Sequence, residues 1–304
     1  MLFLILMTSC PVLASDSLPA ITDYRPLFQP VRNQAEQQYV AIRSFRRGAI
    51  PFYLVVDPAT FATTVLPADS LRSAPPLAST PYGRCLERFT SPPYRLQNHG
   101  ATRAARPVSG VTLTVDLCPS GRPFERELFN RLGRLAARDG KPAPVAIAIT
   151  GLWLERHGAD LAWLVEEGRQ GRLAITWVNH SDHHPYDARL PLEQTFLLTA
   201  GIDPAQELLA LERKLLEHGI VPSPFVRFPG LVADARVIGT ARKLGLIPLG
   251  SDAWLAKGEL PQDGSFILVH GNGNEPRGIE KFLAYLDRQP PARFLSLAAN
   301  FTGE

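Results

Sequence analysis

The larger part of this 304-residue chain is predicted to be α/β, a sheet of about seven parallel strands covered by helices, with a small β-rich region before it. In a chain of this size the sheet is either a barrel or an open doubly wound sheet. Two observations predict this fold class. From Val111 onward, short apolar runs rich in β-branched residues alternate with segments of helical period. These runs are apolar throughout, which is typical of parallel strands that helices cover.

The bulk composition is that of an ordinary globular protein. Hydrophobic residues make up 45% of the chain and charged residues 20%. The net charge of +3 is small, and Lys and Arg are spread along the chain rather than gathered into a tract. The composition therefore gives no reason to expect a nucleic-acid partner.

Residues 1–14 are predicted to be a signal peptide. An apolar run at 2–7 is followed by small residues, and Val12-Leu13-Ala14 before Ser15 resembles a cleavage site, although the usual basic start is missing. We therefore expect an exported protein, periplasmic or secreted. A lipoprotein processed at Cys10 and a short core helix are the alternatives. The apolar run is too short to span a bilayer, so no transmembrane segment is expected in the mature chain.

Residues 15–106 are expected to form a β-rich N-terminal region followed by a linker. The segments 38–45 and 50–67 are predicted to be short strands, with a turn at Asp57-Pro58. Pro and Ser are frequent from residue 67 to 107, which favours loops. No group of residues in this region suggests a reaction.

The segment 107–304 carries the alternating pattern and is predicted to be a second domain. Its clearest helix begins after Asp203 as N-cap, has Pro204 in its first turn and stops at Gly219. Helices are predicted at residues 126–139, 151–168, 204–219 and 234–245. Strands are predicted at residues 111–116, 144–150, 173–179, 224–230, 246–252, 266–270 and 292–297.

Two cysteines, Cys85 and Cys118, remain after the expected cleavage. In an exported protein, two cysteines suggest a disulfide. Two separate buried thiols are the alternative, and the sequence does not decide between them.

Polar residues stand at or just after the C-terminal ends of five predicted strands. In a parallel α/β barrel these ends meet at one mouth, where active sites form. Each residue alone has an ordinary explanation, such as a turn cap, a surface ion pair, a helix N-cap or a buried histidine. Five of them on different strands are better explained by one shared pocket. They are Asp116, His180, Arg227, Asp252 and His270.

The segment NHSDHHP, residues 179–185, contains three of the seven histidines. His180 and His184 are four residues apart, so in a helical turn they share one face and suit one divalent metal, commonly zinc. Ser181 is placed to cap that turn, and His183 is expected at the surface or behind the ligands. A polar loop that is merely rich in His is the alternative.

From about residue 107 the chain resembles the polysaccharide deacetylase family, also known as the NodB-homology or carbohydrate esterase 4 family. Five motifs carry the resemblance, in the order of the family. LTVDLCPS (113–120) is similar to the first motif, a strand ending Thr-Phe-Asp-Asp-Gly-Pro, and NHSDHHP is similar to the second. RFPG (227–230), SDAW (251–254) and LVH (268–270) are similar to the other three.

The resemblance implies that the α/β part is a distorted (β/α) barrel of about seven parallel strands. It also implies that a divalent metal, zinc above all, activates water to hydrolyse N-acetyl groups on a polysaccharide or oligosaccharide. His180 and His184 would bind the metal. Asp116 would be the base, and His270 would be the acid that protonates the departing amine. Arg227 would hold Asp116 ionised, and Asp252 would orient the His270 ring.

Three further residues are expected to contact the substrate. Trp254, in the fourth motif, would form an apolar wall against the acetyl methyl or the sugar face. Pro229 belongs to the third motif. Asn272 lies in the loop HGNGNEPRG (270–278), which follows the acid and either contacts sugar hydroxyls or only forms a turn.

The first motif departs from the family at the third metal ligand. The family has two adjacent Asp residues and the second binds the metal, whereas this chain has Asp116-Leu117. We expect Asp116 to be a ligand as well as the base. The alternatives are a ligand from Asp182 or His183, a thiolate ligand from Cys118, which zinc accepts and which excludes a bridge to Cys85, and a site that holds metal weakly or not at all.

The leading interpretation is an exported, metal-dependent carbohydrate deacetylase. A non-catalytic glycan-binding protein on the same barrel is the first alternative, because Leu117 offers no ligand atom. A hydrolase of another amide or ester is the second. The motifs do not distinguish peptidoglycan, chitin-like oligomers and exopolysaccharide as substrates.

Overall fold

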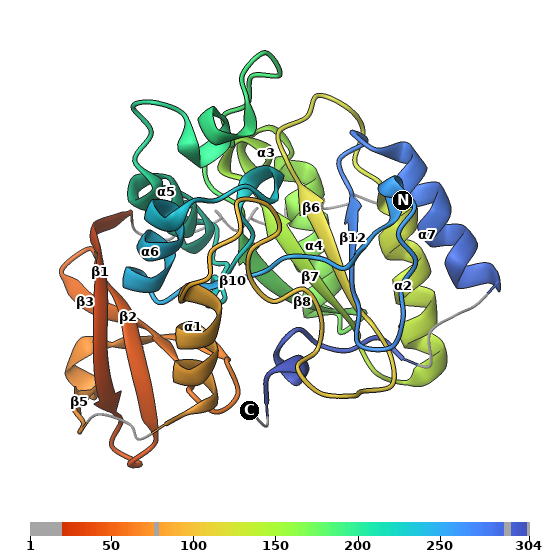
Figure 1. Ribbon diagram of the computed structural model, residues 1–304. Helices are drawn as coiled ribbons and strands as arrows, with labels where there is room; N and C mark the ends of the chain where they lie inside the picture. The colour runs from red at the N-terminus through yellow and green to blue at the C-terminus, as the bar shows by residue number, and fades with distance from the viewer. Residues whose placement is uncertain (1–19, 76–78, 289–292, 303–304) are drawn as a thin grey trace, which may run out of the picture.

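The computed structural model describes residues 20–75, 79–288 and 293–302. The expected signal peptide and Cys10 lie outside these residues. An antiparallel sheet of five strands comes first, and a curled sheet of seven parallel strands with helices follows it (Figure 1). The predicted fold class, a distorted α/β barrel preceded by a β-rich region, is confirmed.

The N-terminal sheet has the strand order β4-β3-β2-β1-β5. The sequence predicted its middle strands but missed the first, which contains Pro26 and Pro30. Proline cannot donate to a strand ladder and is usual only at edges and bulges, and the register of the first strand shifts on both sides of Pro26. The strands are β1 (Ile21–Arg32), β2 (Gln38–Arg47), β3 (Ile50–Val56), β4 (Thr63–Pro67) and β5 (Arg72–Ser73).

The segment expected to be a loop-rich linker contains a helix, α1 (Pro81–Thr90). The backbone N–H of Gly83 donates to Oγ1 of Thr80, which caps the helix, and Pro81 occupies its first position. Tyr82 is buried, and its hydroxyl donates to the carbonyl of Gly245 at 2.6 Å. The helix therefore packs on the barrel.

Residues 97–104 also belong to the barrel wall. The N–H of Ala101 donates to the carbonyl of Pro248, and the N–H of Gly250 donates to the carbonyl of Ala101. The Asn98 side chain holds the backbone of Ser251 through two hydrogen bonds of 2.7 and 2.8 Å. The second half of the expected linker is thus tied to the barrel by regular backbone hydrogen bonds.

The parallel sheet has the order β10-β9-β8-β7-β6-β12-β11. Its central strands lie close to their predicted positions because they are the long, continuously apolar runs. The edge strands are short. The strands are β6 (Thr112–Leu117), β7 (Ala143–Ile149), β8 (Leu173–Asn179), β9 (Phe225–Val226), β10 (Ile247–Pro248), β11 (Ala253–Trp254) and β12 (Phe266–His270).

The seventh strand is not the predicted one. Of the predicted strand at 292–297, the structure describes 293–297, and these residues make a single parallel bridge, between Phe294 and Val111. The seventh place is taken by β11, which pairs with β12. Two residues are too short to give a periodic pattern, so the sequence does not signal this strand.

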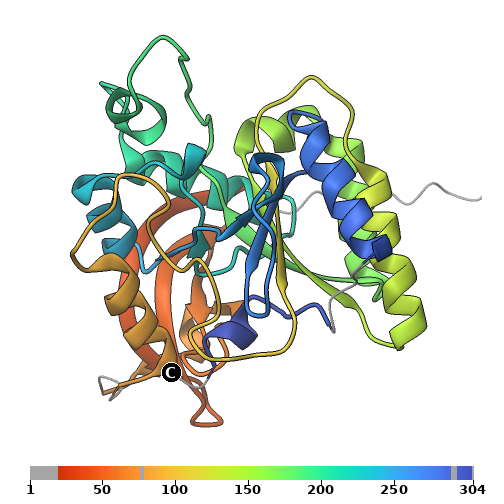
Figure 2. The same ribbon diagram turned by 45° about the vertical axis from the view of Figure 1, so that its right-hand side comes forward.

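Helices cover the sheet on two sides, with α2 and α7 lying side by side in both views (Figures 1 and 2). The predicted helix at 151–168 is two helices that meet at His157, and the last helix was not predicted. The helices are α2 (Arg126–Asp139), α3 (Gly151–Arg156), α4 (Gly158–Arg169), α5 (Pro204–Glu217), α6 (Ala235–Lys243) and α7 (Pro276–Arg288). Short 3-10 turns are η1 (Ala68–Ser70), η2 (Leu192–Gln194), η3 (Phe196–Leu198), η4 (Pro229–Leu231), η5 (Leu255–Lys257) and η6 (Ala298–Asn300).

The two faces of β6 differ in chemistry. Leu113, Val115 and Leu117 belong to the apolar core that includes residues of α2, α4 and α7. Asp116 alternates with them and lies on the other face, because successive side chains of a strand point to opposite sides. This alternation places Asp116 inside the barrel and Leu117 outside it.

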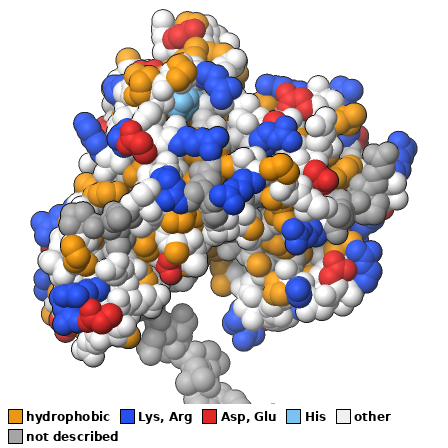
Figure 3. Space-filling view, turned by 60° about the horizontal axis from the view of Figure 1, so that its bottom comes forward, with side chains coloured by type: hydrophobic (Ala, Val, Ile, Leu, Met, Phe, Trp, Pro, Cys, Tyr) orange, Lys and Arg blue, Asp and Glu red, His pale blue; other side chains and the backbone are white. Residues whose placement is uncertain are grey.

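The charged residues of the surface are spread over several places. On the face in Figure 3, Lys and Arg side chains form several separate groups with hydrophobic and uncharged side chains between them. Within the described residues, no helix is long and apolar enough to cross a membrane.

A buried ion pair joins the N-terminal sheet to the barrel. Arg43 of β2 and Glu212 of α5 are both fully buried, and two hydrogen bonds of 2.6 and 2.8 Å link them. Tyr24 of β1 donates a third hydrogen bond to the same carboxylate at 2.8 Å. Charges buried this deeply are tolerated only when paired, so the pair fixes how the two parts fit.

Glu212→Gln should lower the free energy of unfolding by about 3–5 kcal/mol, because it leaves the Arg43 charge buried without a counter-charge. Urea unfolding followed by circular dichroism measures the change. Glu166→Gln is the control, because Glu166 pairs with Arg169 at the surface and should contribute little. Equal stabilities of the two variants would contradict the assignment.

Candidate functional site

The C-terminal ends of the parallel strands surround a cleft of about 610 Å³. Among the residues that line it are five that the sequence predicted: Asp116, His180, His184, Trp254 and His270. They come from β6, the loop after β8, β11 and β12. The expectation that separate strand ends share one mouth is therefore met for these residues.

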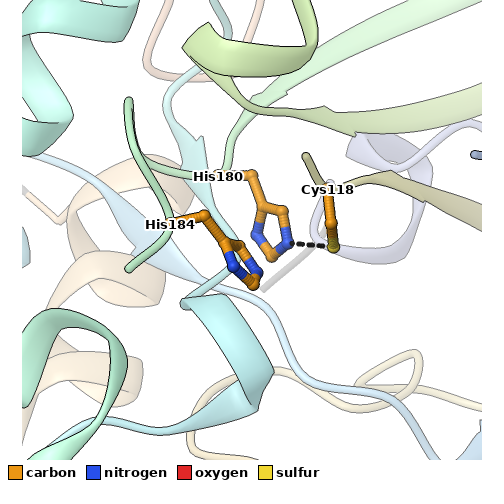
Figure 4. A group of neighbouring side chains, drawn as sticks. All are labelled: Cys118, His180 and His184. Atoms are coloured by element: carbon orange, nitrogen blue, oxygen red, sulfur yellow. Dashed lines mark hydrogen bonds between the residues drawn. The ribbon is translucent and has the colours of Figure 1, made fainter. Parts of the chain in front are cut away.

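Three side chains in the cleft form a group that can hold a metal ion. One ligand atom each from Cys118, His180 and His184 lie within 4.8 Å of one another. Figure 4 shows the two imidazoles and the thiol turned toward the same space. Two nitrogens and one sulfur are a donor set that suits zinc, and three protein ligands leave one position open.

The hydrogen bonding of His180 leaves the ring nitrogen that faces Cys118, Nε2, free to bind a metal. Its Nδ1 donates to the backbone carbonyl of Arg227 at 2.8 Å, so Nε2 carries the lone pair. Nε2 lies 3.4 Å from Sγ of Cys118. Burial lowers the pKa of His180, which favours the neutral ring that a metal requires.

His184 reaches the group through an unusual backbone path. The expected helical turn does not form: Ser181 and His184 both have positive φ, 66° and 51°. The Ser181 hydroxyl still accepts a hydrogen bond from the N–H of His184, as its expected capping role requires. Nε2 of His184 is buried and has no hydrogen-bond partner. Left-handed backbone at two non-glycine residues is strained and concentrates at functional sites.

Cys118 directly follows β6 and lines the cleft together with Asp116, two residues earlier. Burial would raise the pKa of the Cys118 thiol, but the charges of His184 and His270 lower it to about 7. The thiol of Cys118 is not in a disulfide, and Cys85 lies in α1. Of the two alternatives for the cysteines, the structure has separate buried thiols.

The group that can hold a metal contains Cys118, whereas Asp116 was the expected third ligand. Oδ2 of Asp116 is 3.8 Å from Nε2 of His180, farther than the Cys118 sulfur. The two other candidates are engaged elsewhere. Lys214 lies 2.7 Å from Oδ1 of Asp182, and Glu207 lies 2.7 Å from Nδ1 of His183. Cys118 is therefore the candidate third ligand that the described residues place beside the two histidines.

Arg227 stands behind Asp116. It is fully buried, and its Nη2 donates to Oγ1 of Thr114 and to the carbonyl of Gly250. Its Nη1 lies 3.7 Å from Oδ1 of Asp116, an atom that is buried and accepts no hydrogen bond. The geometry agrees with the expected role of Arg227 beside the carboxylate.

His270 is paired with Glu275 rather than with the expected Asp252. Nδ1 of His270 lies 2.8 Å from Oε2 of Glu275, a close ion pair although the angle is poor for a hydrogen bond. Trp254 donates to the same oxygen at 2.9 Å. Asp252 accepts from the N–H of Phe266 and lies 3.7 Å from Arg103, so it holds the barrel wall.

Two expected substrate-binding residues do not line the cleft. Asn272 is fully buried, and its amide donates to the carbonyl of Cys118, which positions the thiol. Pro229 is buried at the start of η4, and its neighbours Gly230 and Leu231 line the cleft instead. Both lie in loops that border the cleft, but their side chains are buried and do not line it.

Among the cleft residues that the sequence analysis missed, four have polar or aromatic side chains. Glu275 and Asn274 lie in the loop after His270, and Tyr186 and Phe196 lie in the loop after the histidines. A carboxylate five residues after His270 was a usable signal, because an acid histidine is commonly oriented by a carboxylate. No sequence pattern marks the two aromatic residues.

The comparisons with known proteins concern both parts of the chain. Residues 22–78 match the family described as the RP012 protein N-terminal domain. The structure is similar to a family 4 carbohydrate esterase from Bacillus anthracis, with 18% identity, a TM-score of 0.48, and 74% of this chain and 93% of that chain covered.

Two further solved structures are similar. One is the chitin deacetylase of Colletotrichum lindemuthianum, with 16% identity, a TM-score of 0.46, and 67% and 92% of the two chains covered. The other is a family 4 pseudoenzyme from Bacillus anthracis, with 12% identity, a TM-score of 0.45, and 66% and 68% covered. At such values the chemistry of this chain has to come from its own side chains.

The purified protein should bind about one equivalent of zinc, and His180→Ala should abolish binding. Cys118→Ser should weaken zinc binding by more than the roughly 10–100-fold that outer-shell partners contribute. With cobalt in place of zinc, the sulfur-to-metal absorption band should disappear in Cys118→Ser. Competition with a chelator and elemental analysis measure both effects.

The matched controls separate the candidate third ligands. Cys85→Ala should leave zinc affinity unchanged, because Cys85 is buried in α1. If Cys118→Ser bound zinc like the parent while Asp116→Asn lost it, Asp116 would be the third ligand after all.

Proposed function

We propose that this protein is an exported, metal-dependent deacetylase that hydrolyses N-acetyl groups on a glycan. One observation carries the proposal: a Cys118–His180–His184 group, a buried carboxylate and a histidine–carboxylate pair line the same cleft. The five motifs of the sequence suggest the reaction. Export rests on the pattern of residues 1–14.

Cys118, His180 and His184 would hold the metal, and zinc fits them best. The donor set is soft enough for zinc, Nε2 of His184 is buried without a partner, and His180 is held in the tautomer that binds. When bound, such an ion polarises a carbonyl oxygen and lowers the pKa of water.

Asp116 is the proton acceptor. Its Oδ1 is buried, lies 3.7 Å from the Arg227 guanidinium and accepts no hydrogen bond, so it is available to take a proton from the attacking water. Arg227 stabilises the ionised carboxylate and holds it in place. The water oxygen forms a bond to the acetyl carbon, and its proton moves to Asp116.

His270 is the proton donor. Burial would lower the pKa of His270, but the nearby Cys118, Glu275 and Asp116 raise it well above its ordinary value, so the ring stays protonated. It gives its proton to the nitrogen as the carbon–nitrogen bond breaks. The products are acetate and an amino sugar.

Trp254 closes the cleft beside the acid. Its ring lies 5.9 Å from that of His270, and Nζ of Lys257 lies 3.7 Å from its ring centroid on another side. The indole N–H is held by Glu275. A ring fixed in this way forms a firm apolar wall for the acetyl methyl.

The zinc-loaded protein should release acetate from an oligomer of N-acetylglucosamine. Asp116→Asn should slow the release by about 10²–10⁴-fold while zinc content is unchanged, since a general base typically contributes that factor. Acetate measured by an enzyme-coupled assay gives the rate.

A zinc-loaded protein that binds the oligomer without releasing acetate would overturn the enzymatic proposal. The non-catalytic glycan-binding protein would then be the better account. Arg122→Ala is the control for the Asp116 variant, because Arg122 bonds the carbonyl of Gly273 outside the cleft lining and should leave the rate near that of the parent.

Glu275→Gln should shift the basic limb of the kcat/KM profile to lower pH. Glu275 helps to raise the pKa of His270, so its neutralisation lowers that pKa. His270 must be protonated to donate, and the variant therefore loses activity earlier as the pH rises. Glu259→Gln is the control. It neutralises a carboxylate that accepts a hydrogen bond from the backbone N–H of Trp254, and it should leave the pH profile unshifted. An unshifted profile in Glu275→Gln would contradict the pairing.

A further inference from the structure

A large aromatic side chain stands exposed at the rim of the cleft. Tyr186 lies two residues after His184, and 63% of it is exposed to solvent. It lines the same cleft as the metal-binding group, on a loop that rises above the barrel in Figure 1. Exposed aromatic surface inside a ligand cleft marks a contact site for a ligand.

Tyr186 is one half of a stack. Its ring lies parallel to that of Phe196, with centroids 5.0 Å apart and planes at 16°. Phe196 is buried, so it covers one face of the Tyr186 ring and leaves the other toward solvent. The two residues are ten positions apart in a loop without regular strands, and only the folded loop brings them together.

The stack is held rigidly and is tied to the metal-binding group. Phe196 contacts the His184 ring edge to face, at 5.2 Å and 83°. Its backbone has a positive φ of 54°, which is strained for an aromatic residue. On another side the ring touches Gly230, whose own φ is 60° and where any β-carbon would collide with it. The backbone is thus shaped to fix this ring.

The surroundings of the stack are polar and suited to hydroxyl groups. His183 lines the cleft and its side chain is 60% exposed, while Glu207 fixes one of its ring nitrogens. Asn274 lines the cleft as well, and its amide oxygen accepts from Ser120. A flat apolar face with hydrogen-bonding groups nearby matches a sugar ring, which has an apolar face of C–H bonds and a polar edge.

We propose that the Tyr186–Phe196 stack is a sugar-binding subsite, which holds a pyranose ring of the glycan adjacent to the sugar that loses its acetyl group. This inference rests on the proposed function for the identity of the glycan. The free face of Tyr186 carries the C–H face of the ring, and Phe196 sets its distance from His184. The subsite makes the protein selective for oligomers over a single sugar.

The test is the binding of a tetramer of N-acetylglucosamine to the zinc-loaded full chain, measured by isothermal titration calorimetry. Tyr186→Ala should weaken binding about five- to tenfold, which corresponds to one aromatic stacking contact. Tyr186→Phe should bind like the parent, since the ring alone makes the contact. Binding of the N-acetylglucosamine monomer should change little in either variant.

Tyr94→Ala is the matched control, because Tyr94 is also exposed but contacts His99 outside the cleft. Zinc content must be equal in all variants, which excludes a disturbed His184 as the cause. Equal tetramer binding by Tyr186→Ala and the parent would overturn the subsite. So would a parent that binds no tetramer, or a Tyr186→Phe variant as weak as Tyr186→Ala.

Failure of the sugar-binding subsite can be distinguished from failure of the proposed deacetylase activity. In a chain that releases acetate, Tyr186→Ala should raise KM for the tetramer about five- to tenfold with kcat nearly unchanged, because stacking is the same in the ground and transition states. In Asp116→Asn, the tetramer should still bind. If the parent bound the tetramer through Tyr186 but released no acetate, the subsite would stand and the deacetylase proposal would fail.

Discussion

The hydrogen bond from Nδ1 of His180 to the carbonyl of Arg227 is the interaction on which the candidate site depends. It joins the ends of two neighbouring strands and leaves Nε2 of His180 facing Cys118. The same Arg227 directs its guanidinium to Asp116. One residue therefore orients a candidate metal ligand with its backbone and the proposed proton acceptor with its side chain, so the two cannot move independently.

Helix α5 supports this arrangement from behind. Glu207 holds His183, Lys214 holds Asp182, and Glu212 lies 3.5 Å from the amide of Asn179. Because Glu212 also pairs with Arg43, the N-terminal sheet takes part in fixing the histidine loop. These contacts hold the strained backbone conformation of His184 in place, because a strained loop persists only where its surroundings fix it.

The sequence predicted which strand ends carry polar residues but not which way each side chain points. Asp116, His180 and His270 do line one cleft, because parallel strands bring their ends together whatever the details of packing. Asp252 was expected in the cleft for the same reason, and Asn272 because of its place in the loop after His270. Asp252 is bound to the barrel wall and Asn272 to the Cys118 carbonyl instead. Hydrogen-bond partners distant in the chain decide such cases, and a single sequence does not contain them.

Periodicity by itself determined the α/β class and the central strands, because long, continuously apolar runs are typical of a parallel sheet that helices cover. Short strands such as β11, and the segment 97–104 that is hydrogen-bonded to the barrel, show no periodic pattern in the sequence. Only the tertiary structure decided where they lie. It also decided which side chains gather around His180. Leu117 ends β6 with its side chain in the apolar core, and the next residue, Cys118, turns to the other side and lies beside His180.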